Sequence, residues 1–162
     1  MDQDDALVEK YMKQVAQVMD RIEAHKLQLE SISVQSYSLS VPEHLLNAGV
    51  KISFDTEAAF ALVRERAEAC AKRLSKELDL SLALKQQAID LINRYTTGRE
   101  NYILTARYLN NMSWPEISES MWERNKHPCT KQLRRVCCAA LAKIVLPEDA
   151  IWLDAPGGGT SA

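Results

Sequence analysis

Glycine and proline are scarce in this sequence of 162 residues, which contains five of each. Neither residue occurs between positions 4 and 32 or between positions 56 and 95. Glycine and proline are the residues least compatible with a helix interior, so their absence predicts two long uninterrupted helices. We therefore expect an all-α protein.

Long apolar runs are also missing, because none approaches the roughly 20 residues that a helix needs to cross a bilayer. The chain begins with acidic residues, Asp2, Asp4 and Asp5, and lacks the basic and then apolar pattern of a signal peptide. We therefore expect no membrane partner and a cytoplasmic location.

Motifs of catalysis and metal binding are absent as well. The sequence has no glycine-rich phosphate loop, no nucleophile elbow and no supported acid–base pair. Its four cysteines, Cys70, Cys129, Cys137 and Cys138, form no C-x-x-C pair. Cys129, Cys137 and Cys138 together with His127 suggest zinc, but Cys137 and Cys138 would point about 100° apart on a helix. We expect reduced cysteines, no metal, no cofactor and no enzymatic activity.

A narrow apolar seam runs along residues 4–32. Its members are separated alternately by three and four residues, as in a coiled coil, and polar residues flank them. A single helix cannot bury such a seam, which therefore requires a second helix from the same chain or from a second copy. The seam consists of Val8, Tyr11, Val15, Val18, Ile22, His25, Leu29 and Ile32.

His25 is the polar member of this seam. One interpretation places its ring at the edge of the seam, with one nitrogen in water. The alternative is a buried position that sets the register or responds to pH.

The serine-rich residues 33–55 predict a linker, followed by a helix over residues 56–95. At 1.5 Å per residue, forty residues span roughly 60 Å, which is too long for a compact globule of this size. An extended hairpin or an intertwined homodimer accommodates such a helix better. We therefore assign residues 1–97 to oligomerisation through coiled-coil-like helices.

Positive charge is concentrated in residues 98–146, which hold 8 basic and 4 acidic residues, a net charge of +4. The whole chain has a net charge of −2. A basic segment in an acidic chain favours a polyanionic partner, although a solvated surface can have the same composition.

The same segment predicts three short helices. Gly98 stops the long helix, and the first short helix places Tyr102, Ile103, Ala106 and Leu109 on one face before Asn110-Asn111 ends it. Ser113 to Glu116 form a capping box with proline in the first turn. The second helix then turns four side chains inward, namely Trp114, Ile117, Met121 and Trp122.

The last helix is expected from Cys129 to Val145. Its buried face contains Leu133, Val136, Cys137, Ala140, Leu141 and Ile144. Three short helices with a basic outer face on the last one are typical of a helix-turn-helix domain. The last helix would enter the major groove and contact bases or phosphates. The candidate DNA-binding residues are Lys126, His127, Thr130, Lys131, Gln132, Arg134 and Arg135.

Residues 147–162 are expected to form a disordered tail because they end in "GGGTSA". Within this tail, Ile151, Trp152 and Leu153 form a small apolar cluster flanked by acidic residues. This cluster could dock on its own domain or on a partner.

The stretch "YILTARYLNNMSWPEISESM", followed by a basic helix ending in "AALAKI", resembles phage late-gene transcription regulators of the ArpU/RinA type. Their helix-turn-helix is similar to region four of sigma factors. The matching positions are Arg107, Tyr108 and Leu109, then Trp114, Glu116, Ile117 and Ser118, and finally Ala140 and Leu141. The spacing from Trp114 to Ala140 is several residues longer than the family pattern, with the extra length around "WERNKHP".

This resemblance implies an activator of phage or prophage late genes that binds double-stranded DNA through residues 98–146. It also implies a homodimer in the cytoplasm of a host bacterial cell, with host RNA polymerase as a further partner. The alternative is a helical adaptor that does not bind DNA, in which the heptads bind a partner chain and the C-terminal helices are a docking module.

Overall fold

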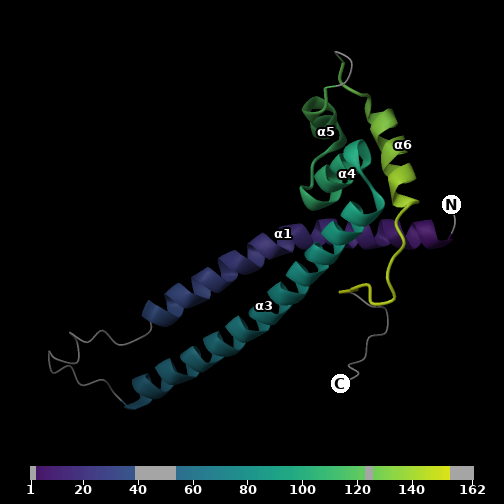
Figure 1. Cartoon of the computed structure of the whole chain (residues 1–162). Helices are drawn as coiled ribbons and strands as arrows, with labels where there is room; N and C mark the ends of the chain where they lie inside the picture. Colours follow the sequence, from purple (N-terminus) through teal and green to yellow (C-terminus); the bar gives the residue numbers. More distant parts are fainter. Residues whose placement is uncertain (1–2, 39–53, 123–125, 154–162) are drawn as a thin grey trace. The chain divides into compact units, whose positions relative to one another are not determined.

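The computed structural model describes residues 3–38, 54–122 and 126–153, and every regular element in these ranges is a helix (Figure 1). The expected all-α fold is confirmed for these residues. None of these helices has a segment long and apolar enough to cross a membrane. The elements are α1 (Gln3–Ser38), α3 (Phe54–Tyr95), α4 (Gly98–Leu104), the π-helix η1 (Thr105–Leu109), α5 (Trp114–Ser120) and α6 (Thr130–Leu141).

The two long helices are confirmed, but several helix ends differ from those expected. α1 continues to Ser38, six residues into the predicted linker, and residues 39–53 of that linker lie outside the described residues. α6 ends at Leu141, before the expected Val145. The chain tightens there, because the N–H groups of Lys143 and Ile144 donate to carbonyls three residues earlier, at 3.1 Å each.

The chain divides into two compact units. Unit 1 comprises Met1–Arg21 and Ser81–Ala162, and unit 2 comprises Ile22–Leu80. Both long helices are therefore shared between the units.

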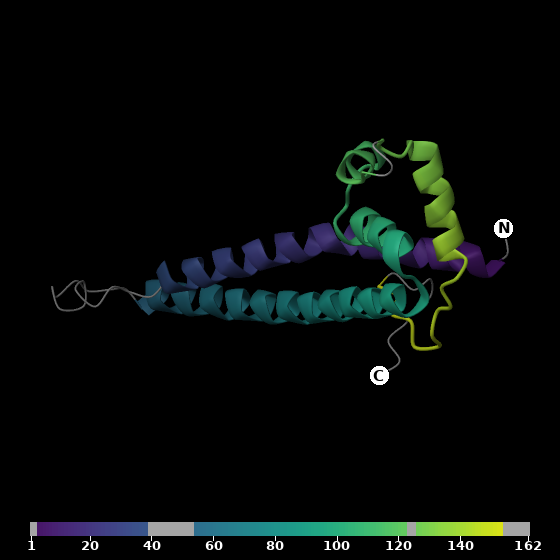
Figure 2. The ribbon, with the colours of Figure 1, turned by 45° about the horizontal axis from the view of Figure 1, so that its top comes forward.

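Unit 2 has few buried side chains. In it the second part of α1 and the first part of α3 run antiparallel (Figure 2). Ile22 and Leu74 are its buried apolar residues within the described side chains, whereas Leu62 and Val63 are exposed. The predicted seam on α3 is therefore only partly covered within this chain.

His25 lies at the edge of the seam in unit 2. Its Nε2 atom is 3.5 Å from a carboxylate oxygen of Glu77, and its side chain is 17% exposed. Its Nδ1 atom is buried and has no hydrogen-bond partner. The ring is therefore packed, as expected. The nitrogen that lacks a hydrogen-bond partner is the buried Nδ1, whereas the sequence predicted a nitrogen in contact with water.

Unit 1 holds the main hydrophobic core. The start of α1, the end of α3 and the short helices all contribute to it, with side chains that recur at helical spacing. The predicted seam residues of α1 up to Val18 are buried here by other parts of the same chain. The core includes Val8, Tyr11, Met12, Val15, Val18, Leu84, Ala88, Leu91, Ile92, Ile103, Leu104, Ala106, Leu109, Ile117, Leu133, Cys137, Ala140, Leu141 and Ile144.

Two left-handed residues direct the chain between these helices. Gly98 has a φ of 56° and is the first residue of α4, which follows the end of α3 at Tyr95. Asn111 has a φ of 52°, and its side-chain amide donates to the Ala16 carbonyl and to Asp20 at 3.0 Å each. Asparagine tolerates this conformation better than most residues, so Asn111 can both end η1 and hold it against α1.

Four side chains expected to face inward on the first two short helices are exposed or only half-buried, namely Tyr102, Trp114, Met121 and Trp122. Tyr102 is 42% exposed, and its hydroxyl donates to Ser120 Oγ at 2.7 Å instead of packing in the core. Trp122 is 64% exposed, because α5 ends at Ser120 and no longer directs this side chain inward. Trp114 is only half-buried.

The first part of the predicted disordered tail is ordered. We call residues 147–153 the tail segment; it begins with a turn in which Ala150 N donates to Pro147 O at 3.1 Å. Trp152 then packs edge-on against Tyr11 of α1, with 5.7 Å between the ring centroids. The apolar cluster at residues 151–153 therefore docks on its own chain.

Candidate nucleic-acid interface

The seven-residue helix α5 depends on contacts at its two ends. The predicted capping box is confirmed at its start: Ser113 N donates to the Glu116 carboxylate at 2.7 Å, and Glu116 N donates to Ser113 Oγ at 3.4 Å. These hydrogen bonds from Ser113 hold the pKa of Glu116 below its usual value. Glu116 is therefore charged at the start of the helix, where negative charge is favourable.

The connector between α5 and α6, residues 121–129, is stabilised by His127. The His127 Nδ1 atom lies 3.1 Å from the Ser118 carbonyl and 2.9 Å from the Met121 carbonyl. Carbonyls only accept hydrogen bonds, so Nδ1 carries the hydrogen and Nε2 remains available to an outside group. Trp122 packs edge-on against the His127 ring at 4.6 Å.

A second contact fixes the end of the connector. Ser118 Oγ donates to the Pro128 carbonyl at 2.5 Å, and Pro128 is buried. Cys129 then caps α6, with its backbone N–H donating to the Gln132 side chain at 3.3 Å. α5 ends at Ser120 and α6 begins at Thr130, and residues 123–125 between them lie outside the described residues.

α6 exposes its basic side chains and buries most of the predicted apolar face, although Val136 is only half-buried. Leu133, Cys137, Ala140 and Leu141 are buried along the helix. We call Lys131, Arg134 and Arg135 the basic row; all three are exposed. The helical period separates the two sets, because the buried residues recur at intervals of three and four, at positions that the row does not share.

Arg134 differs from the rest of the row because it lies over an aromatic ring. Its guanidinium is 5.8 Å from the centroid of the Trp114 ring, and the Arg107 guanidinium is 5.0 Å from the same centroid. Both contacts have cation–π geometry. Trp114 therefore positions two arginines from different helices, which explains why its ring is only half-buried.

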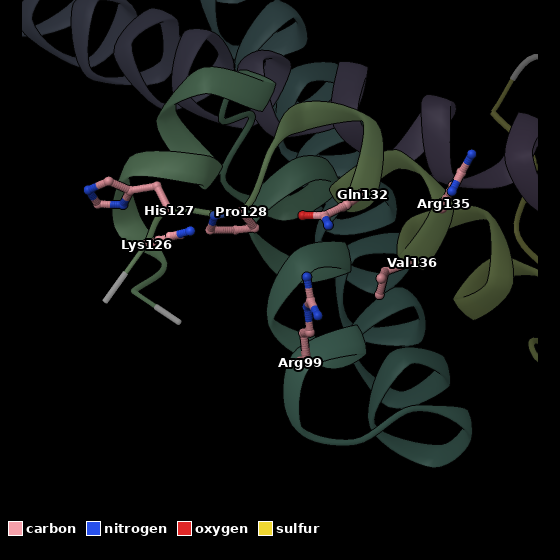
Figure 3. A pocket seen from close by; sticks show the side chains of 7 residues that line it. All are labelled: Arg99, Lys126, His127, Pro128, Gln132, Arg135 and Val136. Carbon is pink, nitrogen blue, oxygen red and sulfur yellow. The ribbon is translucent and has the colours of Figure 1, made fainter. Parts of the chain in front are cut away.

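A surface cavity of about 560 Å³ adjoins the row (Figure 3). Figure 3 shows Arg99 extending from α4 toward α6, with Lys126 and His127 at one end of the cavity. The lining residues are Arg99, Lys126, His127, Pro128, Gln132, Arg135 and Val136. Three of these side chains carry a permanent positive charge, so the cavity is suited to an anionic group.

The positive charge of this surface is largely uncompensated. Within the described part of the chain, no carboxylate pairs with Lys126, Lys131, Arg134 or Arg135. By contrast, Lys143, just beyond α6, forms a 2.6 Å ion pair with Glu100. The basic row and Lys126 therefore remain available to an external anion.

The structure brings four of the seven candidate residues together around the cavity: Lys126, His127, Gln132 and Arg135. Lys131 is exposed on the same helix, and Arg134 lies toward Trp114. Thr130 is the half-buried first residue of α6.

The sequence analysis missed Arg99. It lies 27 residues before Lys126, and the helix period of α6 carries no information about a side chain on α4. Arg99 follows Gly98 directly, at the start of the basic segment, and this position could have identified it as a candidate.

The cysteines near this surface are free thiols in different environments. Cys129 and Cys138 are exposed, whereas Cys137 is buried. Burial raises the pKa of Cys137 to about 11, so this thiol stays protonated at neutral pH. Burial and the neighbouring Cys137 likewise raise the pKa of Tyr108 above its usual value.

Comparison of the sequence with protein-family models found no match, and comparisons with curated proteins and with solved structures found none either.

Proposed function

We propose that this chain is a DNA-binding transcription regulator, an activator of phage or prophage late genes, that binds double-stranded DNA through residues 98–146. The observation that carries the proposal is the basic row on α6. Its three cations are exposed, have no carboxylate partner in the described residues and adjoin a cavity lined by further cations. DNA presents a regular array of phosphates to such a surface.

The arrangement of the short helices supports this proposal. α4 and α5 both pack on α6, and α5 also packs on η1, so that Ile103, Ile117 and Leu133 are fully buried. Such a core leaves the outer face of α6 free for a groove of DNA. The resemblance to phage late-gene regulators favours the same interpretation, with host RNA polymerase as a second partner in the bacterial cytoplasm.

The cationic residues should contact DNA in two different ways, some through phosphates and some through base edges. Lys126 lies on the connector and carries a flexible point charge, so we expect it to contact phosphate. Arg134 is held by Trp114, and a positioned guanidinium suits bidentate recognition of a guanine edge. Its loss should cost roughly 1–3 kcal/mol on the cognate site and little on random DNA.

The test is a binding titration with random-sequence duplex at two salt concentrations. Replacing Lys131, Arg134 and Arg135 together by Ala should weaken binding strongly. It should also reduce the slope of log affinity against log salt by about 0.9 for each phosphate that the variant no longer neutralises. A cognate site, selected from a random library, then separates the roles of Lys126 and Arg134.

A matched control replaces Lys72, Arg73 and Lys76 on α3 by Ala, because these residues are also exposed and their loss changes the net charge equally. The control should retain most of the affinity. If both triple variants bind as tightly as the unaltered chain, the basic row does not bind DNA. The helical adaptor then becomes the better description.

We further propose that the chain acts as a homodimer assembled through unit 2. The described part of this unit buries few apolar side chains and exposes Leu27, Leu62 and Val63. A second copy would cover such residues, and a two-fold dimer would place two α6 helices on two half-sites of DNA.

A further inference from the structure

Two glutamine side chains bind the backbone of the tail segment. The Gln87 side chain donates to the Asp149 carbonyl at 3.2 Å and accepts from Ile151 N at 2.9 Å. The Gln14 side chain donates to the Ile151 carbonyl at 3.0 Å and accepts from Leu153 N at 2.8 Å. The four hydrogen bonds therefore involve alternate residues of the tail segment.

Ile151 is the residue that most resembles a paired strand residue, because Asp149 and Leu153 lie in turns. Its N–H and C=O groups both lie toward the glutamines, as those of a strand residue lie along one edge. A glutamine amide both donates and accepts, so Gln14 and Gln87 together satisfy that edge as a strand would. Because only backbone atoms take part, these contacts place no demand on the side chains of the bound peptide.

The Gln87 amide is also held by a contact outside the tail segment. Tyr11 is fully buried, and its hydroxyl donates to Gln87 Oε1 at 2.8 Å. Burial raises the pKa of Tyr11 above its usual value, and the nearby Asp149 charge adds to this effect, so the hydroxyl remains a donor. This bond leaves the Gln87 nitrogen directed at a carbonyl acceptor.

Side-chain selectivity comes from Trp152. Its ring contacts Tyr11 edge-on, and the Lys10 ammonium lies 6.0 Å from its centroid. The exposed acidic residues Glu148 and Asp149 precede this tryptophan. A peptide with an aromatic residue at the position of Trp152 therefore complements the site.

The bound segment is accessible to exchange. Ile151, Trp152 and Leu153 are only half-buried, and the Gln87–Asp149 hydrogen bond is exposed to water. We propose that Gln14, Gln87 and Tyr11 form a binding site for a tryptophan-containing peptide. Residues 149–153 occupy it within the chain, and a partner protein's segment of the same kind replaces them. This site does not depend on the proposed binding of DNA.

The first experiment uses the full chain carrying Ile151→Pro, which removes the N–H that Gln87 binds and so weakens the resident segment. The probe is a fluorescent, end-blocked peptide of residues 147–153, followed by anisotropy. The peptide should bind this variant in a saturable way. It should bind the unaltered chain at least about tenfold more weakly, because the tethered segment competes at high effective concentration.

Two further substitutions in the Ile151→Pro chain decide the assignment. Adding Gln87→Ala should abolish peptide binding, whereas adding Gln86→Ala, an exposed neighbour, should leave it unchanged. Peptide binding that persists with Gln87→Ala would overturn the proposal. So would the absence of binding to an Ile151→Pro chain whose circular dichroism matches that of the unaltered protein.

Amide hydrogen exchange in the unaltered chain provides a second, independent measurement. The Ile151 amide should exchange faster in a Gln87→Ala variant and the Leu153 amide faster in a Gln14→Ala variant. Gln17→Ala is the matched control on α1 and should change neither. If neither amide is protected in the unaltered protein, the resident segment does not occupy the site and the proposal fails.

Discussion

At the residue scale, the adjacent thiols of Cys137 and Cys138 should differ sharply in reactivity. Cys138 is exposed, whereas burial of Cys137 raises its pKa to about 11 from an ordinary value of 9.0. Only the thiolate attacks an alkylating reagent, and access is required as well. Iodoacetamide at neutral pH should therefore modify Cys138 and spare Cys137. Peptide mass spectrometry measures this, and equal modification would contradict the burial of Cys137.

The raised pKa of Cys137 predicts how the stability of the folded protein depends on pH. Between pH 9 and about pH 11 the unfolded chain releases the Cys137 proton while the folded chain retains it. The folded state then binds more protons, so its stability decreases as pH rises through this window. A Cys137→Ala variant should lose this part of the decrease, which denaturant unfolding at pH 8 and pH 10.5 can measure.

At the element scale, the connector should lose stability when His127 is replaced. His127→Ala removes the donor shared by the Ser118 and Met121 carbonyls, together with the contact to Trp122. We expect a cost of about 0.5–1.5 kcal/mol, typical of the removal of one hydrogen bond. Lys126→Ala is the matched control, because this exposed neighbour should change stability by less than about 0.5 kcal/mol. Thermal unfolding of the two variants distinguishes a structural His127 from one that acts only on DNA.

The elements also show which features local sequence patterns could predict. The absence of breakers predicted the long helices, and the capping box at Ser113 predicted the start of α5, because both signals act within one helical turn. The buried face of α6 followed from its period in the same way. These predictions needed no knowledge of the rest of the chain.

The failures concern interactions between segments distant in sequence. Tyr102 faces outward because its hydroxyl binds Ser120 on another helix, and Trp122 is exposed because α5 ends earlier than its apolar pattern suggested. Arg99 joins the cavity only through the packing of α4 on α6. The tail segment is held in part by Gln14. In the sequence Gln14 is only a polar residue beside the heptad seam, so this contact could not be predicted.

At the scale of the whole molecule, the proposed homodimer predicts that replacing an exposed apolar residue of unit 2 weakens association. Leu62 is 49% exposed in the single chain, so Leu62→Glu should leave the helices intact. In a dimer the same carboxylate would be buried without a partner, and association should weaken strongly. Light scattering at tens of micromolar should give twice 18.3 kDa for the unaltered chain and a lower mass for the variant.

An exposed position outside the apolar stripe provides the control. Lys72→Glu on α3 makes a larger change in charge but removes no apolar side chain, and should leave the mass unchanged. A mass of 18.3 kDa for the unaltered chain under these conditions would argue against the homodimer.

Because burial is uneven along α3, the two parts of this helix should unfold locally at different free energies. From Leu84 to Ile92 its apolar residues are largely buried, whereas Leu74 is the buried apolar residue among the described side chains before position 80. Local unfolding follows such differences, because a segment with fewer buried side chains opens at a lower free energy. The backbone of α3 should therefore behave as two cooperative segments. Its amides before Leu80 should exchange with solvent deuterium earlier than those after Ser81, and dilution should widen the difference if a second copy protects the first segment.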